Sequence, residues 1–134
     1  MLKQLSIYAE NKKGALQTMT NALYEAGINI WGSVTNDGAE YGINRMVVSD
    51  PDKAKEVLTE KGYLCRFVDV LAVEIEDKPG ALNTLLTALL DSNVNVDYTY
   101  LSFNRDSSTP VMILHTADPE EVQSGAVPLC KGAF

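Results

Sequence analysis

The hydrophobic and polar positions of this chain follow one order of patterns, and that order occurs twice. Residues 5–9 alternate between apolar and polar side chains, as the residues of a half-buried strand do. From Leu16 the apolar residues return at helical spacing, and Gly27 stands where a helix end favours a residue that tolerates positive φ. The pattern therefore predicts a strand, a turn at residues 11–14 and a helix of about three turns.

The following residues extend this pattern to six elements. Extended sequence at 28–31, a turn-rich stretch at 35–42 and apolar residues at 45–48 indicate two strands joined by a hairpin. A helix from Pro51 to Gly62 and a strand at 64–68 complete the order βαββαβ. Helices that connect the strands of one antiparallel sheet must cover the same face. We therefore expect a two-layer α+β sandwich of ferredoxin-like type, with its helices on one face.

The second half of the chain repeats the first half. Residues 5–48 align without a gap with residues 71–114, and 11 of the 44 aligned positions are identical. This repeat predicts two tandem ferredoxin-like βαββαβ sandwiches, residues 1–69 and residues 70–134. The strand-like residues 67–75 close the first copy and open the second, so no linker is expected.

The end of the second copy departs from the template. Elements are expected at 70–75, 79–91, 94–103 and 110–116, but Gly125 and Pro128 interrupt the helical pattern after Pro119. The last fifteen or so residues are expected to form a short helix and a weak edge strand, or to be partly disordered.

The net charge of the chain makes two classes of partner unexpected. The formal net charge is −7: residues 1–68 balance 8 basic against 8 acidic residues, whereas residues 69–134 hold 3 against 10. Without a basic stripe the chain would repel phosphate backbones and anionic lipid, so neither nucleic acid nor a membrane is an expected partner. No apolar run reaches membrane-spanning length, and no signal peptide is expected before the first strand.

The two cysteines, Cys65 and Cys130, lie in similar contexts, after a leucine and before a basic residue. They are read as repeated strand positions rather than as a crosslink, which favours a reduced, cytoplasmic protein. His115 is the only histidine, and no cysteine or acidic residue lies near it at metal-ligand spacing. Phosphate-binding, nucleophile and dinucleotide motifs are also missing from the sequence. We therefore expect no cofactor, no metal and no enzymatic activity.

Two landmarks occur in both copies and resemble the signature of the ACT domain. They are Asn11-Lys12-Lys13-Gly14-Ala15-Leu16 with Ile28-Asn29-Ile30, and Asp77-Lys78-Pro79-Gly80-Ala81-Leu82 with Val94-Asn95-Val96. The first copy has a lysine where the second has the proline. ACT domains are ferredoxin-like modules that bind amino acids and regulate metabolic enzymes. The resemblance implies a free amino acid as ligand, held where two modules meet.

The chemistry of these residues agrees with such a ligand. A glycine before the helix lets the backbone approach a ligand, and the N–H groups of the first helical turn attract a carboxylate. We expect the asparagine after the helix to lie near the same rim and to bond the ammonium group. The expected contacts are Asn11, Gly14, Ala15, Leu16, Asn29 and Ile30 in the first copy, and Asp77, Gly80, Ala81, Leu82, Asn95 and Val96 in the second.

Alternatives remain open at this point. The glycines can simply form tight turns, and the asparagines can bond the local backbone. The two sites are expected to be unequal, because Trp31 and Gly32 align with Asp97 and Tyr98. A scaffold or regulatory subunit that pairs with a metabolic enzyme and binds no small molecule is the main rival hypothesis. The two modules can pair within one chain or across a twofold axis in a homodimer, and intramolecular pairing together with a homodimer is favoured.

Overall fold

The computed structural model of the chain describes residues 1–36, 41–103, 109–119 and 122. The chain divides into two compact units. The first unit is Lys3–Val68, and the second contains the described residues from Asp69 onward together with Met1 and Leu2. One long strand, β4 (Leu64–Glu74), crosses the boundary, as the strand-like run at 67–75 predicted.

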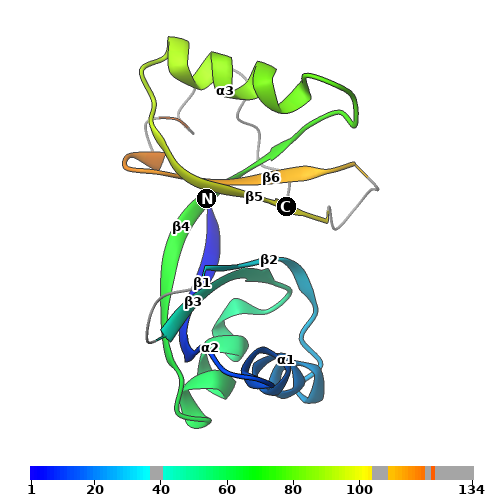
Figure 1. The fold of residues 1–134 in the computed structure, drawn as a ribbon, viewed down its shortest axis with the longest axis vertical. Helices are drawn as coiled ribbons and strands as arrows, with labels where there is room; N and C mark the ends of the chain where they lie inside the picture. Colours follow the sequence, from blue (N-terminus) through cyan, green and yellow to red (C-terminus); the bar gives the residue numbers. More distant parts are fainter. Residues whose placement is uncertain (37–40, 104–108, 120–121, 123–134) are drawn as a thin grey trace. The chain divides into compact units, whose positions relative to one another are not determined.

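The first unit has the six elements that its sequence pattern predicts, in the predicted order (Figure 1). They are β1 (Leu2–Glu10), α1 (Ala15–Glu25), β2 (Ile30–Asn36), β3 (Tyr41–Val48), α2 (Pro51–Glu60) and the start of β4. In the sheet, β1 lies between β3 and β4, and β3 pairs antiparallel with both β1 and β2. The register places Leu5 opposite Met46 and Ile7 opposite Asn44.

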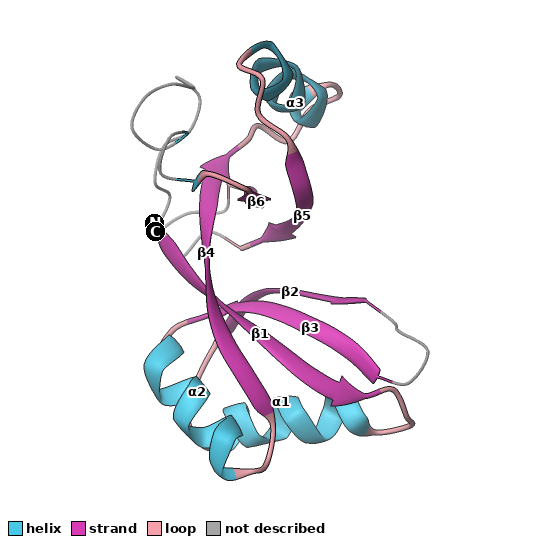
Figure 2. Ribbon diagram, turned by 90° about the vertical axis from the view of Figure 1, so that its left-hand side faces the viewer, coloured by secondary structure: helices cyan, strands magenta, loops and turns pink. Residues whose placement is uncertain are grey.

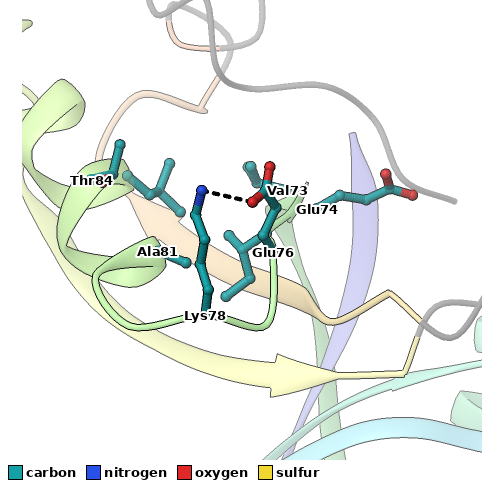
Figure 3. A pocket seen from close by; sticks show the side chains of 8 residues that line it. Val73, Glu74, Glu76, Lys78, Ala81 and Thr84 are labelled. Atoms are coloured by element: carbon teal, nitrogen blue, oxygen red, sulfur yellow. Dashed lines mark ion pairs between the residues drawn. The ribbon is translucent and has the colours of Figure 1, made fainter.

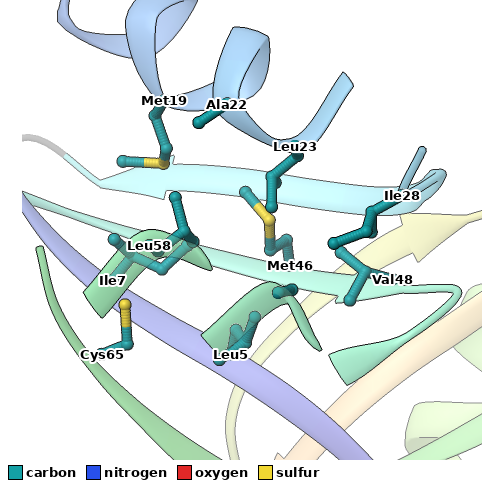
Figure 4. Close-up of a cluster of buried hydrophobic side chains, with 11 residues drawn as sticks. Leu5, Ile7, Met19, Ala22, Leu23, Ile28, Met46, Val48, Leu58 and Cys65 are labelled. Carbon is teal, nitrogen blue, oxygen red and sulfur yellow. The ribbon is translucent and has the colours of Figure 1, made fainter. Parts of the chain in front are cut away.

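Both helices of the first unit cover one face of this sheet (Figure 2). Their apolar sides and those of β1 and β3 form one buried core, part of which is shown in Figure 4. Its members are Leu5, Ile7, Met19, Ala22, Leu23, Ile28, Met46, Val48, Ala54, Leu58 and Cys65. The core fixes α1 on the sheet and so sets the position of the loop that precedes it.

The helix ends of the first unit follow from local chemistry. Asp50 caps α2, because its carboxylate accepts from the main-chain N–H of Lys53 at 3.2 Å, and Pro51 occupies the first helical position. Gly27 and Gly62 follow α1 and α2 with φ of 74° and 93°, as expected of glycine after a helix. In the second unit Asn93 takes the position of Gly27, with φ of 59°.

The second unit contains the end of β4, α3 (Ala81–Asp91), β5 (Val96–Ser102) and β6 (Val111–Thr116). β6 pairs antiparallel with β4 and with β5. The buried core consists of Leu71, Val73, Leu85, Leu89, Met112, Leu114 and Val122. The helix and strand predicted after Pro119, and Cys130 with them, lie outside the described residues apart from Val122.

The hairpin of the first unit differs from the sequence prediction. The stretch 35–42 was expected to be turn, but β2 continues to Asn36 and β3 already begins at Tyr41. The strands are longer because Thr35 pairs with Asn44 across the ladder and their side chains bond at 2.7 Å. Small polar side chains that bond across strands resemble turn residues in a sequence.

Candidate functional site

A glycine in the left-handed conformation precedes the first helix of each unit. Gly14 has φ 83° and ψ −6°, and Gly80 has φ 86° and ψ −4°. A side chain is strained at this φ, although a Cβ added at either position would meet nothing within 4 Å. Glycine is therefore required by the conformation of the turn, and the space beside it is open.

The turns leave main-chain donors at the start of both helices. No side chain caps α1 or α3, and neither helix has an acidic residue in its first turn. The N–H of Ala15 donates to the carbonyl of Lys12, and the N–H of Ala81 donates to that of Lys78. The next two N–H groups of each first turn have no acceptor within an α-helix. Together with the helix dipole they favour an anion.

An ion pair lies beside each turn at repeat-related positions. Lys12 Nζ lies 3.0 Å from Glu10 Oε2, and Lys78 Nζ lies 2.7 Å from Glu76 Oε2. Lys78 holds the pKa of the Glu76 carboxyl below its ordinary value, mainly through the hydrogen bond that it donates and secondly through its positive charge. Because these side chains are exposed, the pairs contribute little to stability. They do place an ammonium group next to each helix start.

A cavity adjoins each of these turns. In the second unit a cavity of about 230 Å³ is lined by Glu76, Lys78, Ala81 and Thr84, among others. Figure 3 shows Lys78 directed toward Glu76, with Ala81 and Thr84 of α3 opposite. The corresponding cavity of the first unit, about 390 Å³, is lined by the repeat-related Glu10, Lys12, Ala15 and Thr18. The two units thus place the same four residue types around equivalent spaces.

The threonine that lines each cavity donates a hydrogen bond to the glycine of the turn. Thr18 Oγ1 donates to the carbonyl of Gly14, and Thr84 Oγ1 donates to that of Gly80, both at 2.9 Å. Sequence reasoning did not select the glutamate, lysine and threonine of the two turns as site residues. The glutamate, the lysine and the threonine are each identical in the two copies. This identity is the sequence feature that would have indicated them.

The structure separates each asparagine from the glycine of its own unit. Gly14 begins α1 and Asn29 follows its end, and 11 helical residues span about 16 Å. Asn29 and Ile30 line a shallow groove with Tyr24 and other residues of α1, whereas Gly14 lines the cavity at the helix start. The expectation that Asn29 and Asn95 lie at the rim of their own glycine turn therefore does not hold within a unit. β1 and β2 both pair antiparallel with β3 and are therefore parallel to each other. The end of β1, which leads to Gly14, and the start of β2, which follows Asn29, thus lie at opposite ends of the sheet.

The remaining predicted residues lie close to the turns or in the core. Ala15 and Ala81 line the two cavities, and Leu16 and Leu82 are exposed on the first turns. Asn11 lines a second cavity of the first unit, described below. Asp77 is exposed in its loop. Val96 packs against the core of the second unit.

A polar cluster surrounds Asn95 at the start of β5. Asn95 Nδ2 donates to Asp97 Oδ1 at 3.1 Å, and His115 Nδ1 lies 2.9 Å from Asp97 Oδ2. The rings of Tyr98 and His115 are stacked, with centroids 4.9 Å apart. The sequence spacing around His115 gives no indication of this contact with Asp97. The register brings Asp97 to it from a position 18 residues earlier.

The register of the ladder shifts just after the asparagine in both units, but the residue within the shift differs between them. The ladder shifts between Ile30 and Gly32 in β2 and between Val96 and Tyr98 in β5. The residues within these shifts are Trp31 and Asp97. Asn29 is held through its main chain, because its N–H donates to Ser49 Oγ at 2.9 Å. The side-chain amide of Asn95, by contrast, is oriented by a carboxylate.

The described residues contain neither a cluster of metal ligands nor a membrane-spanning helix. No group of three or more His, Cys, Asp or Glu side chains is placed to hold a metal ion within these residues. In the same residues, no helix has the length and apolar character to cross a membrane.

Known proteins resemble this chain in sequence and in fold. Residues 1–128 match the family described as ACT domain pair. Protein BT0572 from Bacteroides thetaiotaomicron is 30% identical, with a TM-score of 0.81 over 96% of this chain and 85% of that chain. The ligand-free regulatory subunit of aspartate kinase from Thermus thermophilus shares the fold at 15% identity, with a TM-score of 0.71 over 95% and 89% of the two chains. The corresponding subunit from Thermus flavus has 17% identity and a TM-score of 0.59 over 96% and 91%. No curated protein matches the sequence.

Proposed function

Because the chain belongs to the family of ACT domain pairs, we propose that it is a regulatory protein that binds a free amino acid and has no enzymatic activity of its own. One observation carries this proposal. In each unit the first residue of an uncapped helix, which follows a left-handed glycine, lines the same cavity as a lysine.

The proposed contacts begin with the carboxylate of the ligand. In the second unit it accepts from the first-turn N–H groups of Leu82 and Asn83, beside the ammonium group of Lys78. Leu16, Gln17 and Lys12 are the equivalents in the first unit. The two cavities, of about 230 and 390 Å³, lie below and near the lower end of the range for drug-sized ligands, which agrees with a small metabolite.

The ammonium group of the ligand requires a different contact. Since each asparagine lies at the far end of its own helix, we propose that modules pair and that Asn29 or Asn95 is contributed by the paired module. The oxygen of Asn95 suits an ammonium group, because its nitrogen already donates to Asp97. The proposed assembly is a homodimer, and the proposed location is cytoplasmic.

The finer description of the fold is part of this proposal. We propose that residues 1–69 and 70–134 each form a ferredoxin-like βαββαβ sandwich with its helices on one face. The described part of the second unit supplies the first strand, first helix and next two strands of that order. Two modules with the same fold can pair and contact one ligand from both sides.

A second function is favoured by one observation on α3. Leu82, Leu86 and Leu90 are exposed at intervals of four residues and so lie along one side of this helix. An exposed apolar stripe is typical of a protein interface. The alternative is therefore a scaffold or regulatory subunit that pairs with a metabolic enzyme and binds no small molecule. Regulatory subunits of aspartate kinase share this fold, which supports an enzyme as partner in either case.

A thermal-shift panel of the twenty free amino acids separates these functions. A ligand present at about 100 times its Kd stabilises the folded state by roughly 2.7 kcal/mol. The binding hypothesis predicts a raised melting temperature with one or a few amino acids. The scaffold hypothesis predicts a flat panel at millimolar concentrations and a melting temperature that depends on protein concentration.

A further inference from the structure

The first unit contains a second cavity, of about 160 Å³, beneath its glycine turn. Ala9, Leu16 and Met19 form apolar walls, while Thr35 and Asn44 contribute polar groups from β2 and β3. Asn11, Ala15 and Leu16 of the turn also line it. A ligand at the first-turn N–H groups is therefore next to an opening toward the sheet.

The polar side of this cavity is an organised network. Asn44 is only 2% exposed, and its Nδ2 donates to Thr35 Oγ1 at 2.7 Å and to Ser33 Oγ at 3.1 Å. Ser33 Oγ also lies 3.3 Å from Asn44 Oδ1. Because Thr35 accepts from Asn44, the proton of its hydroxyl is available to another acceptor. The Asn44 oxygen has capacity for a second donor.

The network is specific to the first copy. Ser33, Thr35 and Asn44 align with Thr99, Leu101 and Pro110 of the second copy. Leucine and proline at these positions offer neither side-chain donor nor acceptor. Burial of an amide is unfavourable unless it is hydrogen-bonded, and the network satisfies Asn44 in the first unit. Its remaining donor and acceptor capacity faces a cavity and can serve a ligand.

We infer that this cavity receives the side chain of the bound ligand and selects a short, uncharged side chain with a hydroxyl or carboxamide group. The inference rests on the proposed function, because it assumes that the carboxylate lies on the first turn of α1. The hydroxyl of Thr35 and the oxygen of Asn44 bond the end of the ligand. A charged side chain is disfavoured there, because its charge would leave water for a cavity with apolar walls of Ala9, Leu16 and Met19.

The experiment measures the affinity of the full chain, by calorimetric titration, for amino acids that differ in one group. Threonine is compared with valine, serine with alanine, and asparagine with leucine. We expect at least one polar member to bind roughly 10-fold or more tightly than its apolar counterpart. The Thr35→Val variant keeps the shape of the side chain and should bring this ratio close to one. Thr99→Val, on the equivalent strand of the second unit, is the control and should leave the ratio unchanged.

The outcomes distinguish this inference from the function on which it rests. If no amino acid binds the native chain, both fail. If an amino acid binds but only charged or apolar side chains are accepted, or if the ratio is the same in Thr35→Val, the side-chain inference alone is overturned. Ser33→Ala provides a second test, because it removes one partner of Asn44 at an exposed position and should reduce the same ratio.

Discussion

Lys78 and Glu76 form an ion pair of 2.7 Å across the second glycine turn, and Lys12 and Glu10 form the same pair at 3.0 Å in the first. Both pairs are exposed and screened by solvent, so stability does not account for them. Their position does, since the glutamate and the lysine of each pair line the cavity at a helix start that offers donors to an anion. A bound carboxylate would compete with this glutamate for the lysine.

Substitutions of the two partners should therefore change affinity in opposite directions. Glu76→Gln removes the competing charge and should strengthen binding of the selected amino acid several-fold. Lys78→Met should weaken it by a similar factor. Neither should measurably change the free energy of unfolding, because both side chains are exposed. Titration calorimetry measures the affinities, and denaturant unfolding measures the stabilities. Equal affinities in the native chain, Glu76→Gln and Lys78→Met would exclude Lys78 from the site.

The pKa of Glu76 provides a test that needs no ligand. Lys78 lowers it from the ordinary value of 4.5, so the ion pair is present at neutral pH and is lost only as the pH falls through the lowered pKa. An NMR titration of the Glu76 carboxyl carbon should show a midpoint below that value. In Lys78→Met the midpoint should move upward, and an unchanged midpoint would mean that the pair does not exist in solution.

The left-handed turn predicts a cost for any side chain at Gly80. Gly80→Ala should destabilise the chain by roughly 1 to 2 kcal/mol, because φ of 86° is unfavourable for alanine although no atom blocks its Cβ. Gly80→Asn should cost less, since asparagine tolerates this region better. Chemical denaturation compares the three proteins. Equal stability would show that the turn readily adopts another conformation.

The cluster at β5 predicts that Asp97 acts through Asn95. Asp97→Ala frees the Asn95 amide, and binding of the selected amino acid should weaken roughly 10-fold, by about 1.4 kcal/mol. His115→Phe is the comparison variant, because it keeps a ring beside Tyr98 and leaves the bond between Asp97 and Asn95. Calorimetry should show little loss of affinity in His115→Phe. A larger loss in His115→Phe than in Asp97→Ala would contradict this assignment.

The core of the first unit predicts the reactivity of Cys65. Burial raises the pKa of this thiol, so it is protonated and inaccessible at neutral pH. In a Cys130→Ser variant, where Cys65 is the remaining cysteine, a thiol reagent should react only as denaturant unfolds the chain. The same burial makes stability fall as the pH rises above 9.0, because the unfolded thiol ionises there first. Rapid reaction in native buffer would contradict this packing.

Sequence periodicity is sufficient for the order of the elements in the first unit. It also predicts a turn before the first helix of each copy, because a turn depends on neighbouring residues. The position of Asn29 was misjudged, since it depends on the length of α1 and the direction of two strands. The Asp97–His115 contact depends on the register of β5 and β6 and on a bulge, which no local pattern encodes.

The central claim is that the first helical turn of a unit binds the carboxylate of a free amino acid through its main-chain N–H groups. An amide NMR titration of the labelled chain with the amino acid selected by the thermal-shift panel tests it most directly. We predict that the largest shifts occur at the amides of Leu16 and Gln17 or of Leu82 and Asn83. Saturable binding with shifts confined to residues remote from both turns would contradict the account.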